Sequence, residues 1–175
     1  MRVRSMLAMA SVLWVLAGCR QYPASECEKY LAAGDVSVRV PLDDSSNAAI
    51  PLNDRQVLAG TFAPPATLQI KRAAVQIGNS GGAAQGKISL KLCQDERCTI
   101  GRADLAGSRD NDYLAVTLES EFAMRQTGGV VRYELARESG DDKLVVWIYP
   151  AQGKESLMLN GNAESKVLNL MLYQR

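Results

Sequence analysis

The sequence predicts an all-β protein: an antiparallel β-sandwich, with a jelly roll as the favoured form, behind a short N-terminal helix. Three observations support this fold class. Apolar residues recur at every second position from Val36 onward, turn-forming residues separate these runs, and the same part of the chain shows no helical period. Period-two alternation is typical of strands with one buried face.

The expected strands follow one another along the chain, each with apolar residues on one face. Near Lys71–Arg72 the alternation slips from Leu68 and Ile70 to Ala73, Val75 and Ile77, which indicates a β-bulge. The runs are Val36–Leu42, Leu68–Ile77, Lys87–Leu92, Tyr113–Leu118, Val131–Leu135, Leu144–Tyr149 and Leu168–Tyr173.

Turn compositions lie between these runs. Eight or nine short strands at intervals of about 10–15 residues favour a sandwich. The turns are Asp43–Asn47, Gly78–Gly82, Ser108–Asp112, Thr127–Gly129, Ser139–Asp142 and Asn160–Asn162. We find no repeat, low-complexity tract or second domain.

The N-terminus has the features of an export signal. Arg2 and Arg4 precede an apolar run from Met6 to Leu16, and Leu16-Ala17-Gly18-Cys19 closes it. The run is too short to span a bilayer, which takes about 20 apolar residues. The last four residues resemble the lipobox of bacterial lipoproteins. That resemblance implies cleavage before Cys19, a diacylglycerol on its thiol and, in most cases, an acylated amine.

The lipobox resemblance also implies a location. Aspartate after the lipidated cysteine retains enteric lipoproteins in the inner membrane, whereas this chain has Arg20. We therefore expect attachment to the outer membrane, on its periplasmic face. The expected organisation is a signal peptide over 1–18, a lipidated tether and helix over 19–35, and one sandwich domain over 36–175.

The expected helix follows a tether formed by residues 20–25. Ser25 to Glu28 matches a capping box, and Gly34 provides a stop. Cys27, Tyr30 and Leu31 share one face at helical spacing. A helix of two turns is too short to be stable alone, so we expect that face to pack against the domain.

Cys93 and Cys98 are the predicted disulfide. Four polar residues separate them between two strand-like runs, and an exported compartment permits the bond. Two alternatives, a redox-active pair and a thiolate zinc site, have less support. Cys27 is then left over, either as a buried free thiol or as a link to another protein.

Two absences limit the function. The chain has no histidine, which removes the commonest general base, the usual nucleophile pairs and histidine metal sites. Its formal net charge of +1 gives no electrostatic case for nucleic acid. We therefore expect a protein that is not an enzyme and that has no cofactor and no metal.

Val145, Trp147 and Tyr149 form the predicted ligand or partner face, because they alternate with the core positions Leu144, Val146 and Ile148. Such aromatic residues anchor protein contacts, and they also stack on sugar rings. The alternative is a central strand covered on both faces, with these aromatic side chains in the core.

Two other loop compositions are interpreted as structural. Three acidic loop segments could supply oxygen ligands for calcium: Asp43–Asp44, Asp110–Asp112 and Asp141–Asp142. They lie on separate loops and lack the spacing of a calcium-binding loop, so solvated turns are favoured over a calcium site. Gly78–Gly86 joins two strands and is interpreted as a flexible loop, since a phosphate cradle needs a helix after the glycines.

A second, looser resemblance spans Gly86–Cys93, Gly101, Asp104-Leu105 and Ser108–Leu114. This stretch is similar to jelly-roll accessory domains of bacterial envelope and polysaccharide proteins, and it implies the fold more than an activity. The expected function is a membrane-anchored binding or assembly module for a protein partner in an envelope complex for secretion or polymer export. The alternative is a module that binds peptidoglycan or an exported polysaccharide.

Replacing Cys19 by Ser tests the anchor. Serine cannot form the thioether, so we expect an unlipidated, uncleaved precursor. Electrophoretic mobility and labelling with a radioactive fatty acid would report both changes. A Cys19→Ser protein that is still cut and labelled would contradict the prediction.

Overall fold

The computed structural model describes residues 37–54, 56–140, 143–159 and 161–174. Every regular element in these ranges is a β-strand, so the predicted all-β class is confirmed. The strands are β1 (Ser37–Arg39), β2 (Ala48–Pro51), β3 (Val57–Phe62), β4 (Leu68–Gly78), β5 (Lys87–Gln94), β6 (Arg97–Asp104), β7 (Asp112–Met124), β8 (Val131–Ser139), β9 (Val145–Pro150), β10 (Ser156–Leu159), β11 (Asn162–Glu164), β12 (Lys166–Leu168) and β13 (Leu170–Tyr173).

The expected signal peptide, the lipidated Cys19, the tether and the helix at Ser25–Gly34 all lie outside the described residues. Among the described residues there is no helix with the length and apolar character needed to cross a membrane.

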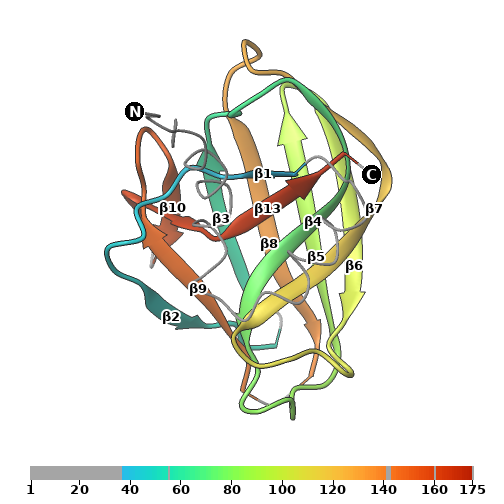
Figure 1. Ribbon diagram of the computed structural model, residues 1–175. Coiled ribbons are helices and arrows are strands. Elements are labelled where there is room, and N and C mark those ends of the chain that lie inside the picture. The colour runs from blue at the N-terminus through green and yellow to red at the C-terminus, as the bar shows by residue number, and fades with distance from the viewer. Residues whose placement is uncertain (1–36, 55, 141–142, 160, 175) are drawn as a thin grey trace, which may run out of the picture.

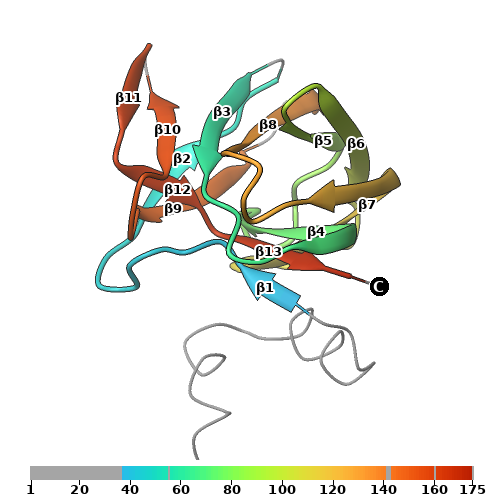
Figure 2. The same cartoon turned by 90° about the horizontal axis from the view of Figure 1, so that it is seen from above.

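The strands form one curled antiparallel sheet (Figure 1). Its order is β1-β13-β4-β7-β6-β5-β8-β3-β10-β11, and β9 pairs with β2, β4 and β12. Figure 2 shows β4, β7, β6, β5, β8 and β3 around a common interior, like a half-barrel. A sandwich would have two stacked sheets. Here the strands are hydrogen-bonded from neighbour to neighbour into one sheet, so the predicted two-sheet arrangement differs from the structure.

The interior of the half-barrel contains the core. Leu90 pairs with Leu135 across β5 and β8, and Leu92 pairs with Tyr133; all four side chains are buried. Burying a large apolar side chain contributes about 1.5–3 kcal/mol. The Tyr133 phenol has a raised pKa because burial disfavours its charged form. Gly60 makes room for this ring, since a Cβ there would collide with the Tyr133 hydroxyl.

The predicted bulge in β4 is confirmed. The β4–β7 register shifts between Ile70 and Arg72, at the place where the apolar phase slips in the sequence. The shift brings the apolar residues on either side of it into the same core. These residues are Ile70 before the shift and Ala73, Val75 and Ile77 after it.

The last strand of the chain is divided at Asn169. Before it, β12 pairs with β9 (Val167 opposite Tyr149); after it, β13 pairs with β4 (Leu170 opposite Val75). The Asn169 N–H donates to the Trp147 carbonyl (3.3 Å), and the Asn169 carbonyl accepts from the Gln76 N–H (3.2 Å). One residue therefore carries the chain from one neighbour strand to the other.

Buried polar side chains fill the point of division. We call Gln76, Tyr113, Tyr149 and Asn169 the Asn169 junction. The Asn169 amide donates to Gln76 Oε1 (2.7 Å) and to the Tyr113 hydroxyl (2.8 Å), and the Tyr149 hydroxyl donates to Gln76 Oε1 (2.8 Å). Both amide protons of Asn169 and two acceptor positions of Gln76 are used, as burial of polar groups requires.

Arg39 on β1 extends the junction to the surface. Its Nε donates to Asn169 Oδ1 (3.0 Å), and its two terminal nitrogens bind both carboxylate oxygens of Asp44 (3.0 and 3.1 Å). The guanidinium also lies 6.0 Å from the centre of the Tyr149 ring. These contacts hold the edge strand β1 against the junction.

Cys93 and Cys98 lie opposite each other on β5 and β6 with their sulfur atoms 2.05 Å apart, which is the distance of the predicted disulfide. The turn is shorter than the expected four-residue loop. Gln94 and Arg97 continue the ladder, so only Asp95 and Glu96 make the turn, with Asp95 at φ +55°. Two-residue hairpin turns need such a left-handed residue.

Asn169→Ala tests the junction. The change leaves buried hydrogen-bonding positions of Gln76 and Tyr113 without their partner, so we expect the free energy of unfolding to fall by about 2–3 kcal/mol. Chemical denaturation measures it. Asn162→Ala on the exposed strand β11 is the control, with an expected change within about 0.5 kcal/mol. Equal effects of the two changes would contradict the role of the junction.

Candidate functional site

Trp147 is the centre of the candidate site. Val145 and Trp147 are half-buried and alternate on β9 with the buried Leu144, Val146 and Ile148, as the sequence predicts. Their side chains therefore lie on the outer face of the strand, and the Trp147 ring is also partly packed against the main core.

Tyr149, the third member of the predicted face, differs from the other two. Its side chain is 1% exposed, and its hydroxyl is bound to Gln76 in the Asn169 junction. Tyr149 therefore offers no exposed surface to a ligand. The predicted face divides into an accessible half, Val145 and Trp147, and a buried structural half.

A loop between β6 and β7 fixes the Trp147 ring. The indole Nε1–H donates to Asn111 Oδ1 at 3.1 Å, and Asn111 has a φ of +56°. Asparagine tolerates this left-handed conformation better than most residues. The hydrogen bond restricts rotation of the ring, so its position is determined before any partner arrives.

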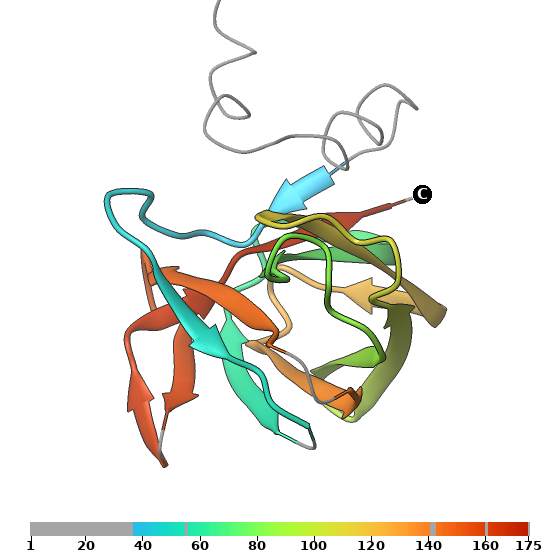
Figure 3. The same cartoon turned by 90° about the horizontal axis from the view of Figure 1, so that it is seen from below.

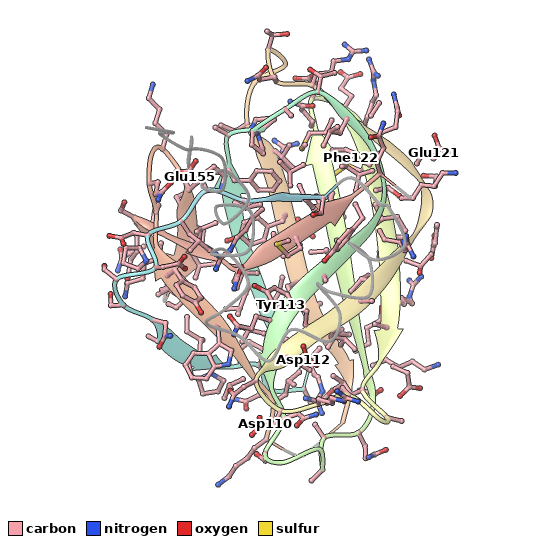
Figure 4. All side chains as sticks on the ribbon, viewed as in Figure 1. Asp110, Asp112, Tyr113, Glu121, Phe122 and Glu155 are labelled. Carbon is pink, nitrogen blue, oxygen red and sulfur yellow. A yellow bond between two sulfur atoms is a disulfide. The ribbon has the colours of Figure 1, made fainter. Side chains whose placement is uncertain are left out.

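The glycine-rich segment after β4 supports that loop. Asp110 accepts a hydrogen bond from the Asn79 N–H (2.7 Å), and the Asn79 amide donates to the carbonyl and hydroxyl of Ser108 (2.9 and 2.7 Å). The start of the segment interpreted as a flexible loop is thus tied by side-chain hydrogen bonds. Figure 4 shows Asp110 and Asp112 at this end of the molecule, opposite Glu121 and Phe122.

Gly78 lets β9 approach this end of β4. A Cβ at Gly78 would lie 2.7 Å from Val145 Cγ2 and 3.5 Å from Trp147 Nε1. The first distance is shorter than carbon atoms tolerate, so a larger residue would displace Val145. Glycine here is a requirement of packing beside the candidate site.

β2 forms the other border of the site. Ala49 lies opposite Trp147, and Pro51 lies opposite Val145. The Leu52 N–H donates to the Leu144 carbonyl (2.8 Å), so by antiparallel alternation the backbone groups of Ala49 and Pro51 point away from β9. Ala48, Ala49 and Pro51 are exposed. In the described part of the chain, β2 pairs only with β9, which leaves this edge open.

We call Ala49, Pro51, Asn111, Val145 and Trp147 the Trp147 ledge. It combines one immobilised aromatic ring, small apolar neighbours and an unpaired strand edge without charged side chains. Proteins commonly protect exposed edges with charges, proline or short length. On β2, the edge is protected only by Pro51 and by the short length of the strand, which has four residues. The ledge can therefore bind by apolar contact and by backbone hydrogen bonding.

A pocket of about 430 Å³ adjoins the loop between β6 and β7, but neither Val145 nor Trp147 lines it. Its walls include Asp104, Ser108, Arg109, Asp112 and Tyr113. Asp112 is buried and accepts a hydrogen bond from the Tyr113 N–H (2.8 Å). The pocket is polar and carries both signs of charge, which distinguishes it from the ledge.

The acidic residues considered for calcium have other roles. Asp44 pairs with Arg39, Asp43 accepts from the Ser45 N–H (2.8 Å), and Asp110 binds Asn79. Within the described ranges, no three potential metal-ligating side chains come together. Asp141 and Asp142 lie outside those ranges.

Comparison with known proteins gives no family for this chain. No protein-family model matches it, and no curated protein matches it significantly. The function is therefore inferred from the site itself.

Proposed function

We propose that this chain is a lipid-anchored, non-enzymatic binding module of the bacterial envelope, and that the Trp147 ledge holds a protein partner in a secretion or polymer-export complex. The anchor is the diacylglycerol on Cys19, and Arg20 directs the protein to the periplasmic face of the outer membrane. The proposed domain is a jelly-roll variant whose two sheets have merged into one curled sheet.

The observation that carries the proposal is the ring of Trp147 fixed beside the open edge of β2. Tryptophan is among the residues enriched at the centres of protein interfaces. Because Asn111 already holds the indole, binding does not have to order it, and this lowers the entropic cost of association.

The edge of β2 indicates how a protein partner would bind. An extended segment can add to an open strand, with backbone hydrogen bonds giving affinity and side-chain contacts giving specificity. Ala49 offers both its N–H and its carbonyl, whereas Pro51 offers only a carbonyl. A short apolar strand from the partner, crossing beside Trp147, fits these groups.

A glycan is the second candidate ligand, and the polar border of the ring favours it. Asn111 is exposed beside Trp147, and the exposed Asp110 comes directly before it on the same loop. An aromatic ring with amide and carboxylate oxygens at its border suits a sugar ring. In that case the ligand would be peptidoglycan or an exported polysaccharide.

Trp147→Ala separates these roles from a structural one. The ring is only half-buried, so we expect a loss of about 1–2 kcal/mol in folding stability, with the domain still folded. A photoreactive residue at Ala49 should cross-link a protein partner in envelope membranes, and Trp147→Ala should reduce that product at least about tenfold.

Met158→Ala is the matched control, because Met158 is 43% exposed on β10, which pairs with β3 and β11 and with neither strand of the ledge. It should leave the cross-link unchanged. Loss of retention on peptidoglycan or exported polysaccharide in Trp147→Ala, without a protein cross-link, would favour the glycan. Unchanged protein and glycan binding in Trp147→Ala would contradict both functions.

A further inference from the structure

A second apolar cluster lies on the outside of the sheet. Met171, Ala74 and Ala115 form one row across β13, β4 and β7, with Tyr173 and Tyr113 beside it. We call these five residues the outer patch. Four of them are buried in a cluster separate from the main core, and Ala115 packs against that cluster.

This burial is unexpected from the direction of the side chains. Ala73, Val75, Leu170 and Leu172 point into the interior, so their neighbours Ala74 and Met171 point outward. Ala74 and Tyr173 are nonetheless completely buried. All described strands belong to one sheet, so a second layer of described strands does not account for the cover.

The outer patch differs from the rest of the outer surface. On β5, β6, β7 and β8 the outward side chains form ion pairs: Lys91 with Glu134, and Arg102 with both Glu119 and Glu138. That surface is suited to water. The apolar cluster that is separate from the main core lies on β13, β4 and the beginning of β7.

The chain enters the fold at the border of the outer patch. Ser37, the first described residue, lies opposite Tyr173 on the edge strand β1. Figures 2 and 3 show β1 at the side of β13, on the outside of the half-barrel. The residues before Ser37 therefore start within reach of the patch.

The sequence before Ser37 has the matching chemistry. Cys27, Tyr30 and Leu31 share one face at helical spacing, while Glu26, Glu28 and Lys29 occupy other positions. Covalent attachment at Ser37 also gives this segment a millimolar effective concentration at the patch. No separate molecule has that advantage.

We propose that residues 26–36, the neck, dock on the outer patch with Cys27, Tyr30 and Leu31 against Met171, Ala74 and Ala115. The neck is then part of the domain, and only residues 20–25 form a free tether. Six residues reach about 20 Å at most. Docking thus holds the β13 side of the domain toward the membrane and limits the directions in which the Trp147 ledge can face.

Cys27 reports this docking directly, because its thiol would be covered. We expect maleimide to label Cys27 at least about tenfold more slowly in the folded protein than after denaturation. Ala115→Asp places a charge in the patch and should restore rapid labelling. Thr117→Asp, two residues further on the same face of β7 but exposed, is the matched control and should not.

Neck variants keep the test valid if Ala115→Asp disturbs folding. Tyr30→Ala with Leu31→Ala should also speed labelling, whereas Glu28→Ala should not. The assay is run on the membrane-anchored protein and on residues 20–175 exported through an unrelated cleavable signal.

Three results would overturn the proposal. Rapid labelling of the unaltered folded protein would show that the neck is free. Protection only in membranes would mean that the apolar face inserts in the bilayer, and protection that disappears on dilution would mean that a second copy covers it. The test involves neither Trp147 nor a partner, so its outcome is independent of the proposed function.

Discussion

The fold depends on the buried hydrogen bonds between Asn169 and Gln76. At this point the last strand leaves β9 and joins β4, and the direct ladder between β4 and β9 has just two residue pairs, Ile77–Val146 and Gly78–Val145. Side-chain hydrogen bonds add to this short ladder: the Asn169 amide and the Tyr149 hydroxyl both bind Gln76 Oε1. In a low-dielectric interior, such a network is strong when complete and costly when one member is missing.

The junction also positions the candidate site. Trp147 and Tyr149 are alternate residues of β9, and the carbonyl of Trp147 accepts the hydrogen bond from the Asn169 N–H. The strand is thus fixed at two points, by the junction at Tyr149 and by Asn111 at the Trp147 ring. Between these points β9 cannot shift relative to β4, and the ring remains beside the open edge of β2. A binding surface on rigid strands is more precisely placed than one on loops.

Local patterns of the sequence predicted the parts of the fold that depend on local chemistry. Alternation located β4, β5, β7, β8 and β9, the phase slip located the bulge after Ile70, and the polar segment between Cys93 and Cys98 located a hairpin. β2 was not predicted, because its sequence Ala-Ala-Ile-Pro is short, exposed and poor in strand-forming residues. The division at Asn169 was hidden because both faces of β13 are buried, so its apolar run looks continuous. The contact of Asn111 with Trp147 joins residues 36 positions apart and depends on which strands are neighbours, which alternation does not specify. Alternation also placed Tyr149 and Trp147 on the same face of β9, and it could not show that neighbouring strands bury Tyr149 and leave Trp147 half-exposed.

Fluorescence of Trp147 tests most directly whether the junction fixes the candidate site, because Trp14 lies in the expected signal peptide and Trp147 is the only other tryptophan. Time-resolved anisotropy separates local motion of the indole from tumbling of the whole protein. In the unaltered protein the decay should contain only the tumbling component. In Tyr149→Phe combined with Asn111→Ala, which removes the hydroxyl that binds Gln76 and the acceptor of the indole hydrogen bond, a fast component should appear while the domain remains folded. A mobile indole in the unaltered protein, or an indole that stays rigid in the folded double variant, would contradict the account.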